Sequence, residues 1–350
     1  MSGDRHHDLI ARLMDGYLST QLLNVAAQLH LADLLRDGPR SSTELAASTG
    51  TRPSALHRLL RGLVVDGVLA EDPDGRFRVT DAGRLLEQDR PDSMRGAVIA
   101  RGELYYQAAG ALIETVRHGG SAFHHAHGVD FFDALAARPD GGAAFHASMT
   151  ARSQQEAAEI VNVYDFSPFE QVVDVGGGRG QLLFAILGTH PHLHGTLFDR
   201  PEALADVPLA LNAAGVVARC ALVPGDFFSG VPAGGDLYVL SRVLHDWDDD
   251  AASRILGSCR QAMSDTAMLL IAEAVLPERA RDKPAAIRMD LHMLTLLAGR
   301  ERTLGEFEQV LRQSGFQLKR VVPVEGRAGI TLLEAQPANR AGHPRSQRQR

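Results

Sequence analysis

Seven short apolar runs, separated by stretches with helical periodicity, fill the second half of the 350-residue sequence. They read QVVDVGG, GTLFDR, CALVPGDFF, DLYVLSRVLH, AMLLIAEAV, FQLKRVVPV and GITLLEAQ. An alternation of short strands and helices is typical of a mostly parallel sheet that is covered by helices on both faces. We therefore predict a doubly wound α/β domain in this half of the chain.

The first of these runs leads into a glycine cluster, VVDVGGGRG. Such a cluster after a strand predicts a tight turn into a helix, where the backbone can approach a ligand closely. A dinucleotide fingerprint, G-x-G-x-x-G, does not fit, because counting from Gly176 puts Gln181 at the place of the third glycine. The spacing is instead acid-x-G-x-G-x-G, formed by Asp174, Gly176, Gly178 and Gly180.

Acids at three successive strand ends indicate which cofactor this turn holds. A carboxylate at Asp174 would repel a pyrophosphate, but it suits the cationic amino acid and the sulfonium of S-adenosylmethionine (SAM). Asp199 lies where a ribose-binding carboxylate is expected, and Asp226 with Phe227 could receive the adenine. A lone aspartate after a strand is usually a turn cap, but three in succession predict SAM. We assign four neighbouring residues to the same site: Arg200, Gly225, Ser241 and Arg242.

The fourth run ends at Ser241, and His245 follows just beyond it, at the carboxyl edge where doubly wound folds bind their ligands. A histidine here is alternatively a cap or core residue, because Asp248 and its neighbours open the next helix. Methyl transfer to a hydroxyl needs a base, since a phenol with a pKa of about 10 is a poor nucleophile. An imidazole can take that proton in the transition state. His245 is therefore our candidate general base.

The N-terminal part is predicted to contain a winged helix behind a long helix. An apolar face over residues 12–35 predicts a helix that packs against a partner. The segment SSTELAASTG carries a capping box, Thr51 and Pro53 start a second helix, and a hairpin turns at Asp74 and Gly75. DNA binding is the alternative for this module. A few arginines in a chain of net charge −7 are weak evidence for it, and the long apolar helix before the module favours a dimer scaffold. The module's candidate DNA contacts are Arg52, His57, Arg58 and Arg61.

Residues 92–165 are predicted to be helical, with breaks at RHGGSAFHHAHGVD and ARPDGGAAF. Two histidine clusters, HHAH and HPHLH, raise the question of a metal site. Their two-residue spacing suits strands or loops, and no cysteine or acid trio accompanies them, so we expect no metal. The first cluster borders the predicted pocket, where one of its histidines could contact the substrate.

Composition excludes several classes of function. The pI near 6.1 gives no general attraction to nucleic acid or to an anionic membrane. Cys220 and Cys259 have no CxxC spacing, which argues against a disulfide framework and a zinc site. No signal-peptide pattern opens the sequence and no apolar run is long enough to span a bilayer. We therefore expect a cytoplasmic enzyme that acts on small molecules.

Five segments in this order, VVDVGGGRG, PGDFF, LHDWDDD, IAE and GRERT, follow the predicted winged helix. Together they resemble the SAM-dependent small-molecule O-methyltransferases of the caffeic acid and hydroxyindole type, which include bacterial enzymes that tailor polyketides and antibiotics. The resemblance covers residues 12–336. It implies a class I methyltransferase fold, a homodimer formed through the N-terminal domain, no metal, and a deep apolar pocket for a hydroxylated aromatic substrate.

The resemblance also implies roles for single residues. His245 matches the family's general base, with Glu273 and Glu301 as the glutamates that flank it. Where plant relatives carry a lysine, this chain has Ser241, so the contact on the adenine side is rebuilt. His292 replaces an asparagine of many relatives and supplies either a second base or, as we favour, a hydrogen bond. By the same comparison Met149 and Ser153 approach the cofactor, and Asp246, Asp290, His292 and Met293 line the acceptor site.

These inferences predict four segments. A winged-helix dimerisation domain spans 1–95, a helical linker and pocket region 96–165, and a SAM-binding catalytic domain 166–337. The basic tail, 338–350, lacks apolar periodicity and should be disordered. We predict methyl transfer from SAM to a hydroxyl of a small aromatic molecule. An N-methyltransferase, a non-methylating SAM enzyme of the same fold, and a SAM-sensing DNA-binding regulator are the alternatives.

Overall fold

The computed structural model describes residues 2–90, 92–137, 139–205, 207–326 and 329–338. The predicted disordered tail, except Ala338, lies outside these ranges. The chain forms two compact units. The first holds residues 1–113 and 123–149, and the second holds 114–122 and 150–350.

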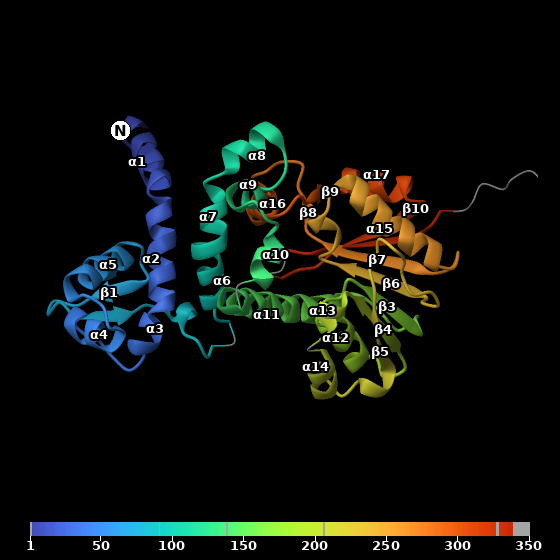
Figure 1. The fold of residues 1–350 in the computed structure, drawn as a ribbon, viewed down its shortest axis with the longest axis horizontal. Coiled ribbons are helices and arrows are strands. Elements are labelled where there is room, and N and C mark those ends of the chain that lie inside the picture. The colour runs from blue at the N-terminus through green and yellow to red at the C-terminus, as the bar shows by residue number, and fades with distance from the viewer. Residues whose placement is uncertain (1, 91, 138, 206, 327–328, 339–350) are drawn as a thin grey trace, which may run out of the picture. The chain divides into compact units, whose positions relative to one another are not determined.

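The N-terminal half is helical, as predicted, and Figure 1 shows its elements in blue to green. The helices and strands of this half are α1 (Ser2–Met14), α2 (Gly16–Gln28), α3 (Leu31–Leu34), α4 (Ser42–Thr49), α5 (Pro53–Val65), β1 (Leu69–Glu71), β2 (Phe77–Val79), η1 (Gly83–Leu86), α6 (Arg95–Ala100), the π-helix η2 (Arg101–Tyr105), α7 (Tyr106–Ala109), α8 (Leu112–His118), α9 (Ala122–His127), α10 (Phe131–Ala136) and α11 (Pro139–Val163). Helices α4 and α5 with the β1–β2 hairpin form the predicted winged helix.

Local signals place the winged helix correctly, with one shift. Ser41 caps α4 and forms the predicted capping box with Glu44, and Gly50 ends the helix in the left-handed conformation. The N-cap of α5, however, is Arg52 and not Thr51, with Pro53 at the first helical position. The Thr51 hydroxyl instead lies 2.9 Å from that of Thr49.

Three predictions about helix boundaries were wrong. The single helix over residues 12–35 is broken after Met14 and again at His30, whose left-handed φ of 53° no right-handed helix can continue. The break predicted at ARPDGGAAF is mostly helix, since α11 starts at Pro139, and proline is well tolerated in a first turn. The HHAH cluster also lies on a helix, α9, and not in a loop.

The second unit is built on a seven-stranded sheet in the order β10-β11-β7-β6-β3-β4-β5 (Figure 1). The five strands from β7 to β5 run parallel, and β11 and β10 add an antiparallel edge. All seven predicted strands are present: β3 (Gln171–Val175), β4 (His194–Asp199), β5 (Cys220–Pro224), β6 (Leu237–Ser241), β7 (Met268–Glu273), β10 (Phe316–Pro323) and β11 (Thr331–Pro337). The chain runs from β3 outward to β5 and then returns to β6, so the strand order reverses between β3 and β6.

Helices cover both faces of this sheet, as the apolar runs predict. Strand side chains alternate between the two faces, so Val172 packs with one layer of helices and Val173 with the other. One layer holds the end of α11 with α12 (Gln181–Thr189), α13 (Pro201–Leu204) and α14 (Val207–Ala213). The other holds α15 (Asp249–Ala262) and α17 (Leu304–Gln313). Short 3-10 turns are η3 (Val217–Arg219) and η4 (Leu244–Asp246).

A second, two-stranded sheet was not predicted. It pairs β8 (Val275–Leu276) in parallel with β9 (Arg302–Thr303), with Val275 opposite Arg302. Helix α16 (Pro284–Leu296) lies between these strands in the sequence. The small sheet matters for function because it brings the GRERT segment beside the end of β7. No helix in the described part of the chain is long and apolar enough to cross a membrane.

Candidate active site

A turn directly after β6 shapes the centre of the site. Arg242 has a left-handed φ of 55°, which is uncommon for a residue with a side chain, and Val243 returns to right-handed angles. This alternation points two successive amide groups the same way, as in the anion-binding arrangement called a nest. The amides of Val243 and Leu244 donate to Oε1 of Glu273 at 3.0 and 2.9 Å. The carboxylate at the end of β7 is therefore fixed by the backbone of the turn that follows β6.

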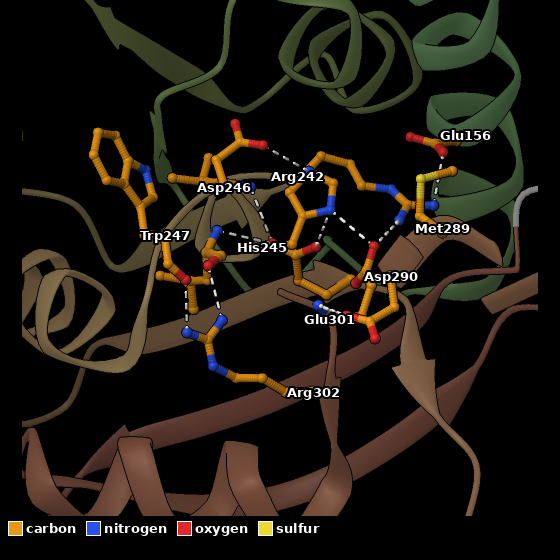
Figure 2. A network of polar contacts seen from close by, with 12 residues as sticks. Glu156, Arg242, His245, Asp246, Trp247, Met289, Asp290, Glu301 and Arg302 are labelled. Carbon is orange, nitrogen blue, oxygen red and sulfur yellow. Dashed lines mark hydrogen bonds and ion pairs between the residues drawn. The ribbon is translucent and has the colours of Figure 1, made fainter. Parts of the chain in front are cut away.

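His245 lies next in the chain, within reach of three carboxylates. Its Nδ1 is 3.0 Å from Oε1 of Glu301 and 3.7 Å from Oε2 of Glu273. Its Nε2 lies 3.4 Å from Asp246. The structure thus brings together the three predicted catalytic residues, all of them buried, and Figure 2 shows His245 between Asp246 and Glu301. A hydrogen bond from Nδ1–H to Glu301 leaves the lone pair on Nε2.

These neighbours raise the pKa of the imidazole. Burial alone lowers it, but the charges of Glu273 and Asp246, together with the hydrogen bond to Glu301, raise the His245 pKa to about 9. Burial raises the pKa of Glu273 to about 7, against the effect of the nearby imidazolium. The surrounding carboxylates therefore favour the protonated form of the ring.

Glu301 is held in place from a different part of the chain. Its backbone amide donates to Oδ1 of Asp290, on α16, at 2.9 Å. Gly299 lies against the backbone of residues 242–247, which we call the catalytic turn. A Cβ atom at this position would run into the carbonyl oxygen of His245 and into Asp246. Only a glycine fits this approach without movement of the backbone. Gly299 opens the GRERT segment, but the sequence analysis gave this glycine no role of its own.

Arg302 holds the catalytic turn through hydrogen bonds to its backbone oxygens. Its side chain is 1 % exposed, and the guanidinium donates to the carbonyl oxygens of Leu244 and Trp247 at 2.8 and 2.9 Å. A third bond reaches Asp249 at 2.9 Å. Sequence reasoning used GRERT only for its glutamate. The arginine two places before the α17 helix carried no periodic signal that would have revealed its burial.

The glycine turn after β3 fits a ligand with positive charge. Asp174 is 2 % exposed, and neither carboxylate oxygen accepts a hydrogen bond of normal geometry from the described residues. Burial, followed by the charge of Asp199, raises the Asp174 pKa to about 7. Gly176 and Gly178 both have positive φ, and the space beside the Gly178 Cα is open. An unsatisfied buried acid beside an open turn is what a bound cation would complete.

The other predicted cofactor residues lie around this turn. Oδ2 of Asp199 accepts from the amide of Gly178 at 2.7 Å, so the second strand end is tied to the first. Asp226 accepts from the amide of Phe228 at 2.9 Å, the turn-capping role that an aspartate often has. Phe227 is 3.5 Å from the Cβ position of Gly176. Gly225 packs on Phe198. Arg200 directly follows β4, and Ser241 is the last residue of β6.

The side chain of Arg242 is directed to two glutamates. Its Nη2 donates to Oε1 of Glu156, on α11, at 2.9 Å, and its Nη1 lies 3.8 Å from Glu301. Glu156 is 4 % exposed and also accepts from Arg152 at 2.8 Å. Figure 2 shows Arg242 between Glu156 and Glu301. Glu156 was not predicted as a site residue, because an acid on a long helix is usually a solvated one.

The remaining predicted residues lie on two helices. Asp290, His292 and Met293 are on α16, and of these Met293 is buried. Met149 and Ser153 are one turn apart on α11 and share a face of it. Met149 belongs to the first unit and Ser153 to the second.

The side chains of His245, Glu273 and Glu301 are also compact enough to surround a metal ion. One ligand atom from each lies within 4.8 Å of the others, and this is the only such group among the residues that the structure describes. However, hydrogen bonds already occupy Oε1 of Glu273 and Oε1 of Glu301. The contacts in place are those of a histidine oriented by carboxylates.

Comparison with known proteins decides the family. Residues 110–317 match the model of the O-methyltransferase domain, and residues 11–89 match that of the O-methyltransferase dimerisation domain. The chain belongs to the O-methyltransferase family. The winged helix lies within the dimerisation domain, as predicted. The predicted fold class, the predicted enzyme class and the expected dimerisation domain are confirmed.

Similar proteins come from bacterial natural-product chemistry. Phenazine O-methyltransferase PhzM of Lysobacter antibioticus is 42 % identical over 330 residues, which cover 94 % of this chain and 96 % of that one. An O-methyltransferase from neocarzinostatin biosynthesis, solved with SAM and 2-hydroxy-5-methyl naphthoic acid, is 32 % identical with a TM-score of 0.81, covering 91 % and 96 % of the two chains. An 8-amino-8-demethylriboflavin N,N-dimethyltransferase of Streptomyces davaonensis is 39 % identical over 308 residues, 86 % of this chain and 88 % of that one.

Proposed function

We propose that this O-methyltransferase transfers the methyl group of SAM to a phenolic hydroxyl of a small aromatic natural product, with His245 as general base. One observation carries the proposal: a buried histidine has Nδ1 on a glutamate and Nε2 at the carboxyl edge of a sheet whose glycine turn holds an unsatisfied acid. The solved relative with SAM and a hydroxynaphthoic acid supports both the donor and the acceptor class.

Asp174 and the glycine turn would hold the positively charged amino acid end of SAM, and Asp199 its ribose. Asp226, Phe227 and Ser241 would surround the adenine. When bound, SAM supplies an electrophilic methyl group. The acceptor oxygen attacks that methyl carbon in line, the bond from carbon to sulfur breaks, and S-adenosylhomocysteine is the second product.

The chain's own contribution is to remove a proton and to fix positions. Nε2 of His245 takes the hydroxyl proton while Glu301, hydrogen-bonded to Nδ1–H, stabilises the imidazolium that forms. The His245 pKa of about 9 means that the ring must first lose its own proton. A cation bound nearby lowers the pKa of the ring and favours this neutral form. Helix α16 would line the acceptor with Asp290, His292 and Met293, and Asp246 would join them from the catalytic turn.

The test replaces the base and follows the product mass. Wild-type enzyme is incubated with SAM and a panel that includes 3-amino-4-hydroxybenzoate and 1,4-dihydroxy-2-naphthoic acid, and methylated product is detected by mass spectrometry. We expect His245→Gln to lower kcat by roughly 10²- to 10⁴-fold with little change in SAM affinity. The matched control, His194→Gln, alters an exposed histidine at the start of β4 and should behave as wild type.

Two outcomes would contradict the proposal. Full turnover in His245→Gln would remove this residue as the base. Methylation at nitrogen of the aminophenol, with the hydroxyl untouched, would favour the N-methyltransferase alternative, which the 39 % identical dimethyltransferase keeps in view. We further propose a cytoplasmic location, which the two buried free thiols of Cys220 and Cys259 support.

A further inference from the structure

Both glutamates beside the candidate base depend on one residue, Arg242. Its left-handed backbone creates the pair of amides that bind Glu273. Its guanidinium lies 3.8 Å from the Glu301 oxygen that pairs with His245. The backbone angle of Arg242 thus sets up the amides of Val243 and Leu244 that hold Glu273, and its side chain faces Glu301.

Retaining this geometry has a cost that the fold must offset. A left-handed backbone angle is unfavourable in a residue with a side chain. The amide of Arg242 still donates to the carbonyl of Ala272 at 3.1 Å, so the ladder between β6 and β7 continues up to this residue. The turn therefore begins at Arg242 itself. A glycine would adopt the same φ without strain, but it would lack the guanidinium.

Glu156 keeps that guanidinium from closing fully onto Glu301. The Arg242–Glu156 contact is 2.9 Å, against 3.8 Å to Glu301, so the shorter bond goes to helix α11. Both acids are buried, and in such surroundings ion pairs interact more strongly than in water. If Arg242 paired fully with Glu301, the carboxylate would be drawn away from the imidazole.

We propose that Arg242 is a positioning residue for the general base, that it sets the orientation and proton affinity of His245 through Glu273 and Glu301, and that Glu156 sets how strongly it acts. This inference rests on the proposed function and revises the assignment of Arg242 to the cofactor. The charged groups that face His245 are Asp246 on its own turn, Arg242 after β6, Glu273 at the end of β7 and Glu301 before β9.

The arrangement predicts opposite effects for two substitutions. Arg242→Gln removes a positive charge beside Glu301, so the His245 ring should titrate about one unit higher. Glu156→Gln frees Arg242 to neutralise Glu301, so the ring should titrate lower. Each variant should lose about 10- to 100-fold in kcat with a smaller change in the KM for SAM. Arg242→Lys should keep the titration near that of wild type but still lower kcat, because an ammonium cannot reproduce the guanidinium geometry.

Two readouts test these effects. The first is the NMR titration of ¹⁵N-histidine-labelled, ligand-free protein in the presence of EDTA, with the His245 signal assigned by its absence in His245→Gln. The second is the pH dependence of kcat with SAM and the best acceptor of the panel. Arg320→Gln, which breaks an ion pair with Glu334 on the antiparallel edge strands, is the control and should shift neither.

Opposite shifts of the ring titration in Arg242→Gln and Glu156→Gln would support the inference. Shifts in the same direction, or none, would overturn it. A raised KM for SAM in Arg242→Gln with unchanged kcat and titration would also overturn it, and would return Arg242 to the cofactor. If Arg242→Gln does not fold, Glu156→Gln and Arg242→Lys decide alone. Because the ring titration needs no turnover, it stays informative even if wild-type enzyme methylates none of the acceptors.

Discussion

At the residue scale, the titrations of the site follow from which charges are buried together. The carboxylates around His245 raise the pKa of its imidazole. Burial raises the pKa of Asp174, whose carboxylate accepts no hydrogen bond of normal geometry from the residues that the structure describes. The two groups lie at the ends of different strands. In the proposed reaction, His245 takes up a proton and Asp174 faces a cationic ligand. The surroundings of each residue favour that positive charge.

The burial of Asp174 predicts a trade-off between stability and binding. Its folded-state pKa is about 7 against an ordinary value of 3.8, so the charge costs folding free energy that grows as pH rises between these values and stays constant above. Asp174→Asn should therefore raise the free energy of unfolding by about 1–3 kcal/mol at pH 8 and by less at pH 5. It should also weaken SAM binding roughly 10- to 100-fold.

Urea unfolding at both pH values and calorimetry with SAM measure the two effects. Asp250→Asn, at an exposed position in the first turn of α15, is the matched control and should alter stability slightly and equally at both pH values. An Asp174→Asn protein that binds SAM as tightly as wild type would remove the acid from the predicted cofactor site.

At the scale of elements, the site is assembled by close backbone approach as much as by side chains. The segment from Gly299 to Arg302 leads into β9 of the short β8–β9 sheet, and its Gly299 packs directly on the catalytic turn. Sequence reasoning located GRERT through a family resemblance and gave no reason for its position. The strand β9 has only two residues, which is too short for a periodic pattern to predict it. The position of the segment is therefore explained only by the fold.

Gly299→Ala tests this approach. Because a Cβ atom would collide with the His245 carbonyl, the catalytic turn must shift, and we expect kcat to fall about 10- to 100-fold with SAM affinity retained. Steady-state kinetics and SAM calorimetry separate the two. Gly257→Ala, on α15 with open space around it, is the control, and it should keep activity and gain up to about 1 kcal/mol of stability. Normal turnover in Gly299→Ala would refute the requirement for a glycine.

At the scale of the whole molecule, the sequence was most informative where residues are buried on both sides. The seven strands of the main sheet were all predicted, and the five parallel strands, which helices cover on both faces, are near-continuous apolar runs. The helix over residues 12–35 was predicted as one piece, since its apolar pattern carries no sign of the turn at His30. The direction of the Arg242 side chain could not be read from the chain, because it depends on Glu156 on α11, 86 positions earlier.

The dimerisation domain leads to a prediction about assembly. Helix α1 presents large apolar side chains to solvent in the single chain, among them Leu9, Ile10 and Leu13. Exposed apolar groups on one helix are typical of an interface. Leu13→Asp should therefore convert the dimer to a monomer at micromolar concentration, as judged by light scattering after size exclusion. Leu209→Asp, an equally exposed leucine on α14 outside residues 11–89, should stay dimeric, and an unaltered dimer in Leu13→Asp would argue against α1 as part of the interface.

The three bonds from Arg302, to Leu244, Trp247 and Asp249, hold the segment that carries the proposed base. If α16 lines the acceptor as proposed, its side chains can differ between related enzymes while the proposed base keeps its place. The residues that would recognise the acceptor are therefore separate from the residues that hold the proposed base. Such a division would let related enzymes methylate different aromatic acceptors while the step that removes the proton stays the same.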